Sequence, residues 1–335
     1  MWSAGILTVA VLVALVAAAL VRVPYVIISP GNATPLDQSV VSVKGATTYE
    51  HRGDLLYLTV TVSNRDPNLF TYVLARLDSN SDVEPRQNVI GCASYEASNR
   101  LAVEGMSDSQ DTAKAIALTH LGYDVPADPS HVQIADVVCG GPSDGRLELG
   151  DVIESVDGTE VLAADQVRPL VVAHRPGDDV TFVVDRGGDR RTVVVRLGRH
   201  AGSPYAGILT RTVTRHAFPV DVTIDTARVS GPSAGLAFSL AIVDDLTPGS
   251  LTRGRSVAVT GTIEPDGRVG PVGGVAQKAV TAERAGARLM LVPRDEVRDA
   301  RRHAGSMRVV GVSTFDDALL ALGRSGITGT AATAK

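Results

Sequence analysis

The chain has 335 residues, of which 44% are hydrophobic and 21% are charged, so it can form a sizeable core and has room for two domains. This composition excludes a collagen-like, coiled-coil or intrinsically disordered protein. The formal net charge is −5 and no run of basic residues interrupts the mixture, so binding to nucleic acid has no electrostatic support.

The first segment, Met1–Val21, contains no charged side chain. As a helix it would rise about 1.5 Å per residue and would cover the roughly 30 Å hydrocarbon core of a bilayer. We therefore predict a single-pass transmembrane anchor within residues 1–27. A cleaved signal peptide is the alternative, but the apolar run is long for one and has no basic residue at its start. Arg22 follows the span, so the charge rule does not predict export of the remaining chain.

The next segment, residues 28–123, combines a predicted strand with a predicted helix. Asp54–Val62 alternates β-branched and apolar side chains, which is typical of a strand. Met106–Leu121 begins with serine and aspartate, repeats apolar residues at spacings of three and four, and is followed by Gly122, which is typical of a helix.

The chain has only two cysteines, Cys92 and Cys139, which are far apart in the sequence. Their number fits neither a zinc site nor a small scaffold held together by disulfides. They either pair with each other or stay free, and the sequence leaves both outcomes open. We predict no metal and no cofactor.

Residues 128–199 form a different pattern, which follows Asp124–Ser130, a stretch with two prolines that we expect to be a linker. His131–Val138 is predicted to be a strand. The following phrase, Leu147–Gly158 (LELGDVIESVDG), resembles the centre of a PDZ domain, in which a Leu-x-x-Gly-Asp-x-Ile turn leads into a strand and an Asp-Gly turn. The resemblance implies a helix over Ala164–Ala173 and then two paired strands.

PDZ domains bind the ends of peptides as an added strand beside an exposed sheet edge. The resemblance makes His131–Val138 the predicted edge strand. However, the loop before it, Pro126–Ser130, lacks the glycine that carboxylate-binding loops of PDZ domains usually contain. A small β-rich spacer without a ligand is therefore the alternative.

A candidate nucleophile lies in the last third of the chain. Ser233 stands at the start of a strongly apolar predicted helix, between Gly231 and Gly235, which allow close approach of the backbone. Free amide groups and the positive end of the helix dipole at such a position can stabilise the oxyanion formed when a serine attacks an acyl carbon. An ordinary serine cap is the simpler explanation for this residue alone.

A serine nucleophile needs a base, and Lys278 is the candidate. It lies in a predicted helix rich in alanine, where burial would lower the pKa of its amine toward the range of a general base. The chain has 28 arginines but only four lysines, and a guanidinium cannot act as a base. The seven histidines are not part of any recognisable triad motif. A solvent-facing helical lysine is the alternative.

Together the motifs Gly231–Gly235 (GPSAG) and Pro271–Lys278 (PVGGVAQK), linked by Val259–Ile263 (VTGTI), resemble the proteolytic domain of the Lon family of serine proteases. The resemblance implies that Ser233 is the nucleophile, that Lys278 is the general base and that the Thr260 hydroxyl supports the lysine.

With a membrane anchor and an inserted PDZ domain, the chain resembles the YlbL-like membrane proteases of bacteria. The expected fold is α+β, with a transmembrane helix over residues 1–27, a Lon-type protease domain in two parts (28–123 and 205–324), a PDZ domain over 128–199 and a disordered tail over 325–335. The resemblance alone implies that both domains lie outside the cytoplasm and that the chain assembles as a hexamer.

The expected function is ATP-independent cleavage of extended protein segments, because no Gly-x-x-x-x-Gly-Lys-Ser/Thr motif for a nucleotide occurs in the sequence. The expected partners are protein or peptide substrates and the membrane. An inactive membrane scaffold that binds peptide tails through its PDZ domain is the alternative. A trypsin-like PDZ protease is disfavoured because its serine motif would precede the PDZ domain.

Overall fold

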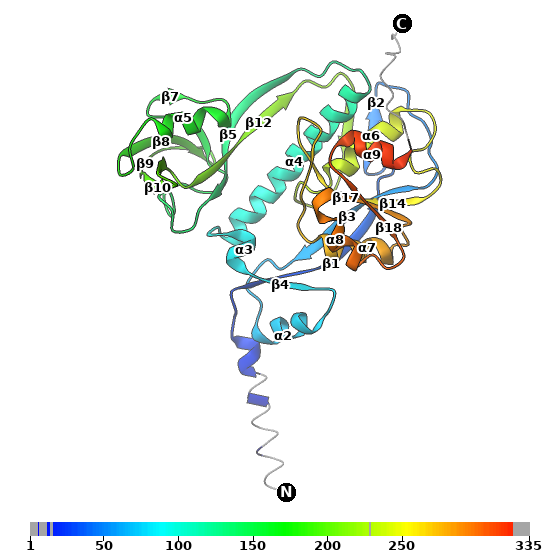
Figure 1. Ribbon diagram of the computed structural model, residues 1–335, viewed down its shortest axis with the longest axis horizontal. Helices are drawn as coiled ribbons and strands as arrows, with labels where there is room; N and C mark the ends of the chain where they lie inside the picture. Colours follow the sequence, from blue (N-terminus) through cyan, green and yellow to red (C-terminus); the bar gives the residue numbers. More distant parts are fainter. Residues whose placement is uncertain (1–5, 7–11, 14–15, 228, 324–335) are drawn as a thin grey trace. The chain divides into compact units, whose positions relative to one another are not determined.

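The computed structural model describes residues 6, 12–13, 16–227 and 229–323, which fall into two units (Figure 1). The first unit contains the chain up to Val89, Val222–Ala227 and the chain from Ser233 onward. The second unit contains Ile90–Asp221 and the described residues 229–232. Residues 1–5, 7–11 and 14–15 of the predicted membrane helix and the whole tail over 325–335 lie outside the described residues. None of the helices in the described part is both long and apolar enough to cross a bilayer.

A six-stranded mixed sheet forms the centre of the first unit. Four neighbouring strands run parallel, and β1 joins β3 and β4 in antiparallel pairs. All five residues of β17 are buried, as expected for an inner strand of a parallel sheet that is covered on both faces. In sheet order, the strands are β18 (Arg308–Val312), β17 (Leu289–Pro293), β14 (Ser256–Val259), β3 (Asp54–Val62), β1 (Tyr25–Pro35) and β4 (Asp82–Pro85).

Helices and two short ribbons complete this unit. α6 is almost wholly buried because its sequence, GLAFSLAIVDDL, is apolar on every side until its end. α7 contacts β1 and β3, and its alanines pack with Leu56 and Leu58 in a common core. The helices are α2 (Leu69–Leu77), α6 (Gly235–Leu246), α7 (Val275–Arg284), α8 (Val297–Arg302) and α9 (Phe315–Leu322), and the ribbons pair β2 (Val41–Lys44) with β13 (Asp221–Ile224) and β15 (Thr262–Ile263) with β16 (Val269–Gly270).

The second unit contains a long helix, α4 (Tyr95–His120), and a second sheet with its own core around Phe182. The sheet curves around α5 (Val167–Val172), which follows a turn of 3₁₀ helix over Ala164–Gln166. Its strands, in spatial order, are β12 (Ile208–His216), β5 (Ala127–Val137), β6 (Val152–Val156), β8 (Asp179–Arg186) and β9 (Asp189–Arg196); β7 (Thr159–Glu160) pairs with β6, and β10 (Gly198–His200) pairs with β11 (Ser203–Tyr205). α3 (Arg86–Ile90) leads into this unit.

The structure differs from the sequence prediction at the start of the second unit. The predicted helix over Met106–Leu121 begins earlier, because the Ser94 side chain accepts a hydrogen bond from the Ala97 backbone N–H (3.1 Å) and caps a longer helix. The predicted linker over Asp124–Ser130 is in part strand. Its Pro129 pairs with Thr214 next to a register shift, a place where a strand tolerates proline.

The prediction that His131–Val138 is the edge strand of the PDZ sheet is also wrong. β5, which contains most of His131–Val138, has β12 on one side and β6 on the other. The outer strand on that side is β12. The sequence did not indicate this because the two partners are about 80 residues apart, and β12 was assigned to the protease part.

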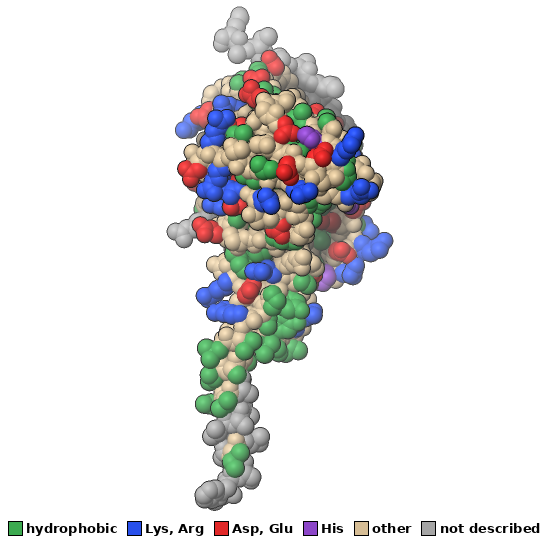
Figure 2. Space-filling model, turned by 90° about the vertical axis from the view of Figure 1, so that its left-hand side faces the viewer, with side chains coloured by type: hydrophobic (Ala, Val, Ile, Leu, Met, Phe, Trp, Pro, Cys, Tyr) green, Lys and Arg blue, Asp and Glu red, His purple; other side chains and the backbone are tan. Residues whose placement is uncertain are grey.

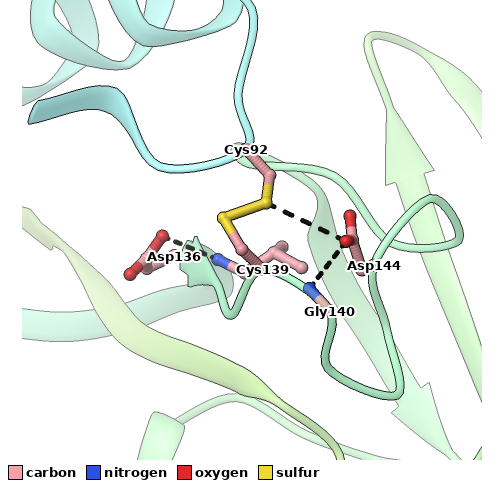
Figure 3. The surroundings of a disulfide bond; sticks show 6 residues. Cys92, Asp136, Cys139, Gly140 and Asp144 are labelled. Carbon is pink, nitrogen blue, oxygen red and sulfur yellow. Dashed lines mark hydrogen bonds between the residues drawn. A yellow bond between two sulfur atoms is a disulfide. The ribbon is translucent and has the colours of Figure 1, made fainter. Parts of the chain in front are cut away.

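The two cysteines form a disulfide, Cys92–Cys139, which links the segment before α4 to the loop after β5 (Figure 3). The Asp144 carboxylate lies 3.9 Å from the Cys92 sulfur and accepts a hydrogen bond from the Gly140 backbone N–H (2.8 Å). This settles the choice between paired and free thiols that the sequence left open.

The disulfide should contribute measurable stability, because it closes a loop of 47 residues in the unfolded chain. Replacing Cys92 and Cys139 together by serine should lower the free energy of unfolding by about 2–4 kcal/mol. Urea titration followed by circular dichroism measures the change. An unchanged midpoint, or a non-reducing peptide map without the cross-linked pair, would contradict this expectation.

Candidate active site

Ser233 lies two residues before the start of α6, in the turn that delivers the chain to the helix. Its carbonyl oxygen accepts hydrogen bonds from the Gly261 backbone N–H (2.9 Å) and from the Thr260 hydroxyl (3.2 Å). The Leu236 backbone N–H donates in turn to the Gly261 carbonyl (3.2 Å). These bonds fix the backbone of Ser233 against the loop after β14.

Lys278 reaches the same point from α7. It lies in the second turn of the helix, and its backbone N–H donates to the Gly274 carbonyl (2.9 Å). Gly274 caps α7 with a positive φ of 65°, and a Cβ there would lie only 2.9 Å from a methyl group of Val60. Only glycine therefore allows both this turn and this close approach of α7 to the sheet.

The amine of Lys278 contacts two hydroxyl groups. Its Nζ lies 2.7 Å from the Ser233 Oγ and 3.0 Å from the Thr260 Oγ1. The structure thus brings together all three residues that the sequence indicated. The distance to Ser233 is within the range expected of a nucleophile and its general base.

Thr260 orders the hydrogen bonds around the amine. Its backbone N–H donates to the Leu291 carbonyl on β17 (3.0 Å), which holds the residue at the end of β14, and its side chain is fully buried. Because its hydroxyl donates to the Ser233 carbonyl, its oxygen is left to accept from the amine of Lys278. The lone pair of a neutral amine can then point toward the Ser233 hydroxyl.

Burial changes the acidity of Lys278. The side chain is only 1% exposed, and this loss of hydration lowers the pKa of the amine from 10.5 to about 7. The charge of Glu296 acts in the opposite direction and raises the pKa of Lys278. A substantial fraction of the amine is therefore neutral near neutral pH, as a base that takes a proton from serine requires.

Glu296 is a residue that the sequence analysis missed. Its carboxylate accepts a hydrogen bond from the Val272 backbone N–H (3.0 Å), and burial raises its own pKa. Glu296 directly precedes α8, and the polar sequence around it is typical of an exposed helix end. No signal in the sequence connects it with Lys278, because the two are brought together only by the packing of α7 against α8.

The second unit offers a separate candidate site along β12. Gly207 directly precedes this strand with a positive φ, and a Cβ on it would lie 2.9 Å from Pro142. The Ala164 backbone N–H donates to the Thr212 hydroxyl (2.9 Å), so the helical segment leading to α5 lies beside β12. An outer strand with a glycine loop before it is the arrangement that PDZ domains use to bind peptide ends.

The glycine missing before the predicted edge strand is thus found before β12. This glycine is part of Ser203–Ile208 (SPYAGI) in the sequence. It was missed because this segment comes after the PDZ pattern, whereas the glycine loop was expected before it.

Comparison with protein families finds a match in each of two parts of the chain. Residues 212–321 match the Lon protease (S16) C-terminal proteolytic domain, and residues 108–197 match the PDZ domain. These matches confirm the predicted presence of a Lon-type serine peptidase domain and of a PDZ domain in one mixed α and β chain.

Curated relatives agree as well. A Lon protease of Azospirillum brasilense is 40% identical over 189 residues, which is 52% of this chain and 22% of the relative. Lon protease 1 of Bacillus subtilis is 40% identical over 172 residues (49% and 21%), and an archaeal Lon protease of Archaeoglobus fulgidus is 29% identical over 201 residues (56% and 31%). The matched region is thus less than a third of the length of each of these relatives.

A solved structure, the PDZ domain of an SdrC-like protein from Listeria monocytogenes, covers 24% of this chain and 86% of its own at 22% identity, with a TM-score of 0.23.

The pH dependence of catalysis should report the protonation of Lys278. Because the neutral amine is the active form, kcat/KM for a peptide substrate should rise with pH through about 7. Glu296→Gln removes the charge that raises this pKa, so the rise should move to lower pH. The control Asp266→Asn, at an exposed carboxylate, should leave the profile unchanged. A profile that stays at the same pH in Glu296→Gln would contradict the assignment.

Proposed function

We propose that this chain, which contains a Lon-type serine peptidase domain and a PDZ domain, is an ATP-independent, membrane-anchored endopeptidase with a Ser233–Lys278 dyad. The observation that carries the proposal is the 2.7 Å contact between the Ser233 hydroxyl and the buried amine of Lys278. A lysine that served only solubility or an ion pair would not need this burial.

In the proposed reaction, the neutral amine of Lys278 takes the proton of the Ser233 hydroxyl while the Oγ atom attacks the carbonyl carbon of the scissile bond. Backbone N–H groups at the start of α6 are the candidates to stabilise the oxyanion. The ammonium group then gives its proton to the leaving amine. Water, activated by the same amine, hydrolyses the acyl-enzyme and restores Ser233. Thr260 keeps Lys278 oriented through both steps.

We propose extended protein segments or tails as substrates. The sequence carries no phosphate-binding loop that could couple ATP to the unfolding of a folded substrate. An unfolded protein should therefore be cut much faster than the same protein in its folded form.

The proposed location is the outer side of a membrane, with Met1–Val21 as the anchor. The Cys92–Cys139 disulfide supports this side, because disulfides persist in oxidising compartments and are rare in the cytosol. Finding these thiols reduced in protein taken directly from its own cells would contradict export. A hexamer, which the Lon resemblance implies, is part of the same proposal.

The PDZ domain is proposed to recruit substrates by their ends. Support comes from the outer position of β12, from its glycine loop and from Leu209, which is 62% exposed on this strand. A peptide added along β12 would extend the sheet and place its terminal carboxylate near the loop.

The dyad is tested with the full chain and an unfolded fluorogenic substrate in the absence of nucleotide. Ser233→Ala and Lys278→Arg should each lower kcat/KM by roughly 10²–10⁴-fold or more, because each removes one half of the proton transfer. Thr260→Val should cause a smaller loss. The control Lys114→Arg changes a lysine that pairs with Asp111 and should have no effect.

If Lys278→Arg keeps its activity, the dyad is refuted. If wild-type protein binds peptides but its Ser233 is not labelled by an acylating serine probe, the inactive scaffold is the better assignment.

The recruiting role of β12 is tested by comparing a substrate that has a free carboxyl terminus with the same peptide amidated at that end. In wild-type protein the free carboxylate should raise kcat/KM by roughly tenfold, which equals about 1.4 kcal/mol of binding. Leu209→Asp should abolish this preference. The matched control Val194→Asp, on the other outer strand, should keep it. Equal cleavage of both peptides by wild-type protein would refute the role.

A further inference from the structure

α2 presents an apolar stripe to solvent. Four large apolar residues at the helical spacing i, i+3, i+4 and i+7 share one face of this nine-residue helix, and none of the helix is buried. The outermost, Leu77, is 78% exposed. An amphipathic helix in a water-soluble domain normally turns such a stripe toward the core, so this orientation is the reverse of the usual one. The four residues, which we call the α2 stripe, are Phe70, Val73, Leu74 and Leu77.

The helix is held in this orientation by its other face. The ring of Tyr72 packs on the ring of Tyr25 at the start of β1, with 4.8 Å between centroids. Arg76 lies over the Tyr72 ring and donates to its hydroxyl (3.4 Å). Asn68 caps the first turn by accepting from the Thr71 backbone N–H (2.7 Å). The exposure of the α2 stripe is thus built into the fold.

The start of α2 is attached to the end of the charge-free N-terminal segment. The Leu69 backbone N–H donates to the Val21 carbonyl (2.9 Å), and Arg22 forms a β-bridge with Asn68. The described residues before this point continue the apolar surface, since Leu20 is 75% and Val16 is 52% exposed. Hydrophobic side chains gather on this part of the space-filling view, at the level of α2 and the N-terminal segment (Figure 2). The two apolar surfaces are therefore neighbours.

We propose that the α2 stripe inserts into the interfacial layer of a lipid bilayer, beside the point where the N-terminal segment enters it. The occupant is lipid because the surface is continuous with a charge-free stretch of 21 residues that is long enough to span the hydrocarbon core. Arg22, which forms the β-bridge with Asn68 at the start of α2, can extend its charged end toward headgroups. A second contact next to the anchor would hold the peptidase unit at a fixed tilt.

This inference rests on the proposed membrane anchor, but a fluorescence experiment separates the two. Trp2 is the only tryptophan of the chain, so it reports the anchor alone. A second protein, Trp2→Phe with Leu77→Trp, reports α2 alone. The control, Trp2→Phe with Leu320→Trp, places the probe on α9 of the same unit, at a residue that is 58% exposed. Each full-length protein is reconstituted into vesicles of phosphatidylcholine with or without bromine on the acyl chains near the headgroup.

The inference expects brominated lipid to remove most of the tryptophan fluorescence at position 77 and little of it at position 320. Quenching at position 77 without quenching of Trp2 would also support α2 as a lipid contact, while the anchor would fail. Quenching of Trp2 alone would overturn the inference and leave the anchor in place. A blue-shifted but unquenched signal at position 77 would overturn it too, since it would indicate that a second copy or another protein covers the stripe.

Discussion

The removal of one amine from water is the constraint on which the active site depends. Lys278 is buried among alanines and apolar strands, and the cost of holding a charge there lowers the pKa of its amine to about 7. The fold provides this environment by bringing α7 close to the sheet through Gly274. The hydroxyl groups of Ser233 and Thr260 are the polar partners of the amine, so the contact that satisfies the lysine also places its amine against the Ser233 hydroxyl.

The contact between Ser233 and Lys278 could be predicted from the sequence because both residues lie in short, local motifs. Ser233 stands between glycines before an apolar helix, and Lys278 is a rare lysine in a chain that otherwise uses arginine. Both signals lie within a few residues of the reacting groups. Glu296 could not be predicted, because its influence on Lys278 is electrostatic and arises from the packing of two helices. The sequence around a polar residue at a helix end is the same whether or not the fold places a charged group near it.

In the second unit, too, features set by neighbouring residues could be predicted, whereas pairings between distant segments could not. The two paired strands that the PDZ resemblance implied after the helix are present as β8 and β9, which are joined by a short turn. The neighbour of β5 was not predicted, because β12 comes about 80 residues later in the chain. A strand pattern indicates that a strand forms, but the choice of its partner depends on the whole sheet. The α2 stripe was also missed, because the short segment was not recognised as a helix.

The pairing of β3 with β14 has a consequence for the order in which the molecule can form. Asp54 and Ser256 are direct partners in this parallel pair, yet the whole second unit is synthesised between them. Contacts of such long sequence separation form late, and domains generally fold as units while the chain is being made. The PDZ-bearing unit can therefore complete its core while the central sheet still lacks β14, β17 and β18. A chain that is still emerging therefore contains Ser233 before it contains Lys278, the residue whose amine contacts it.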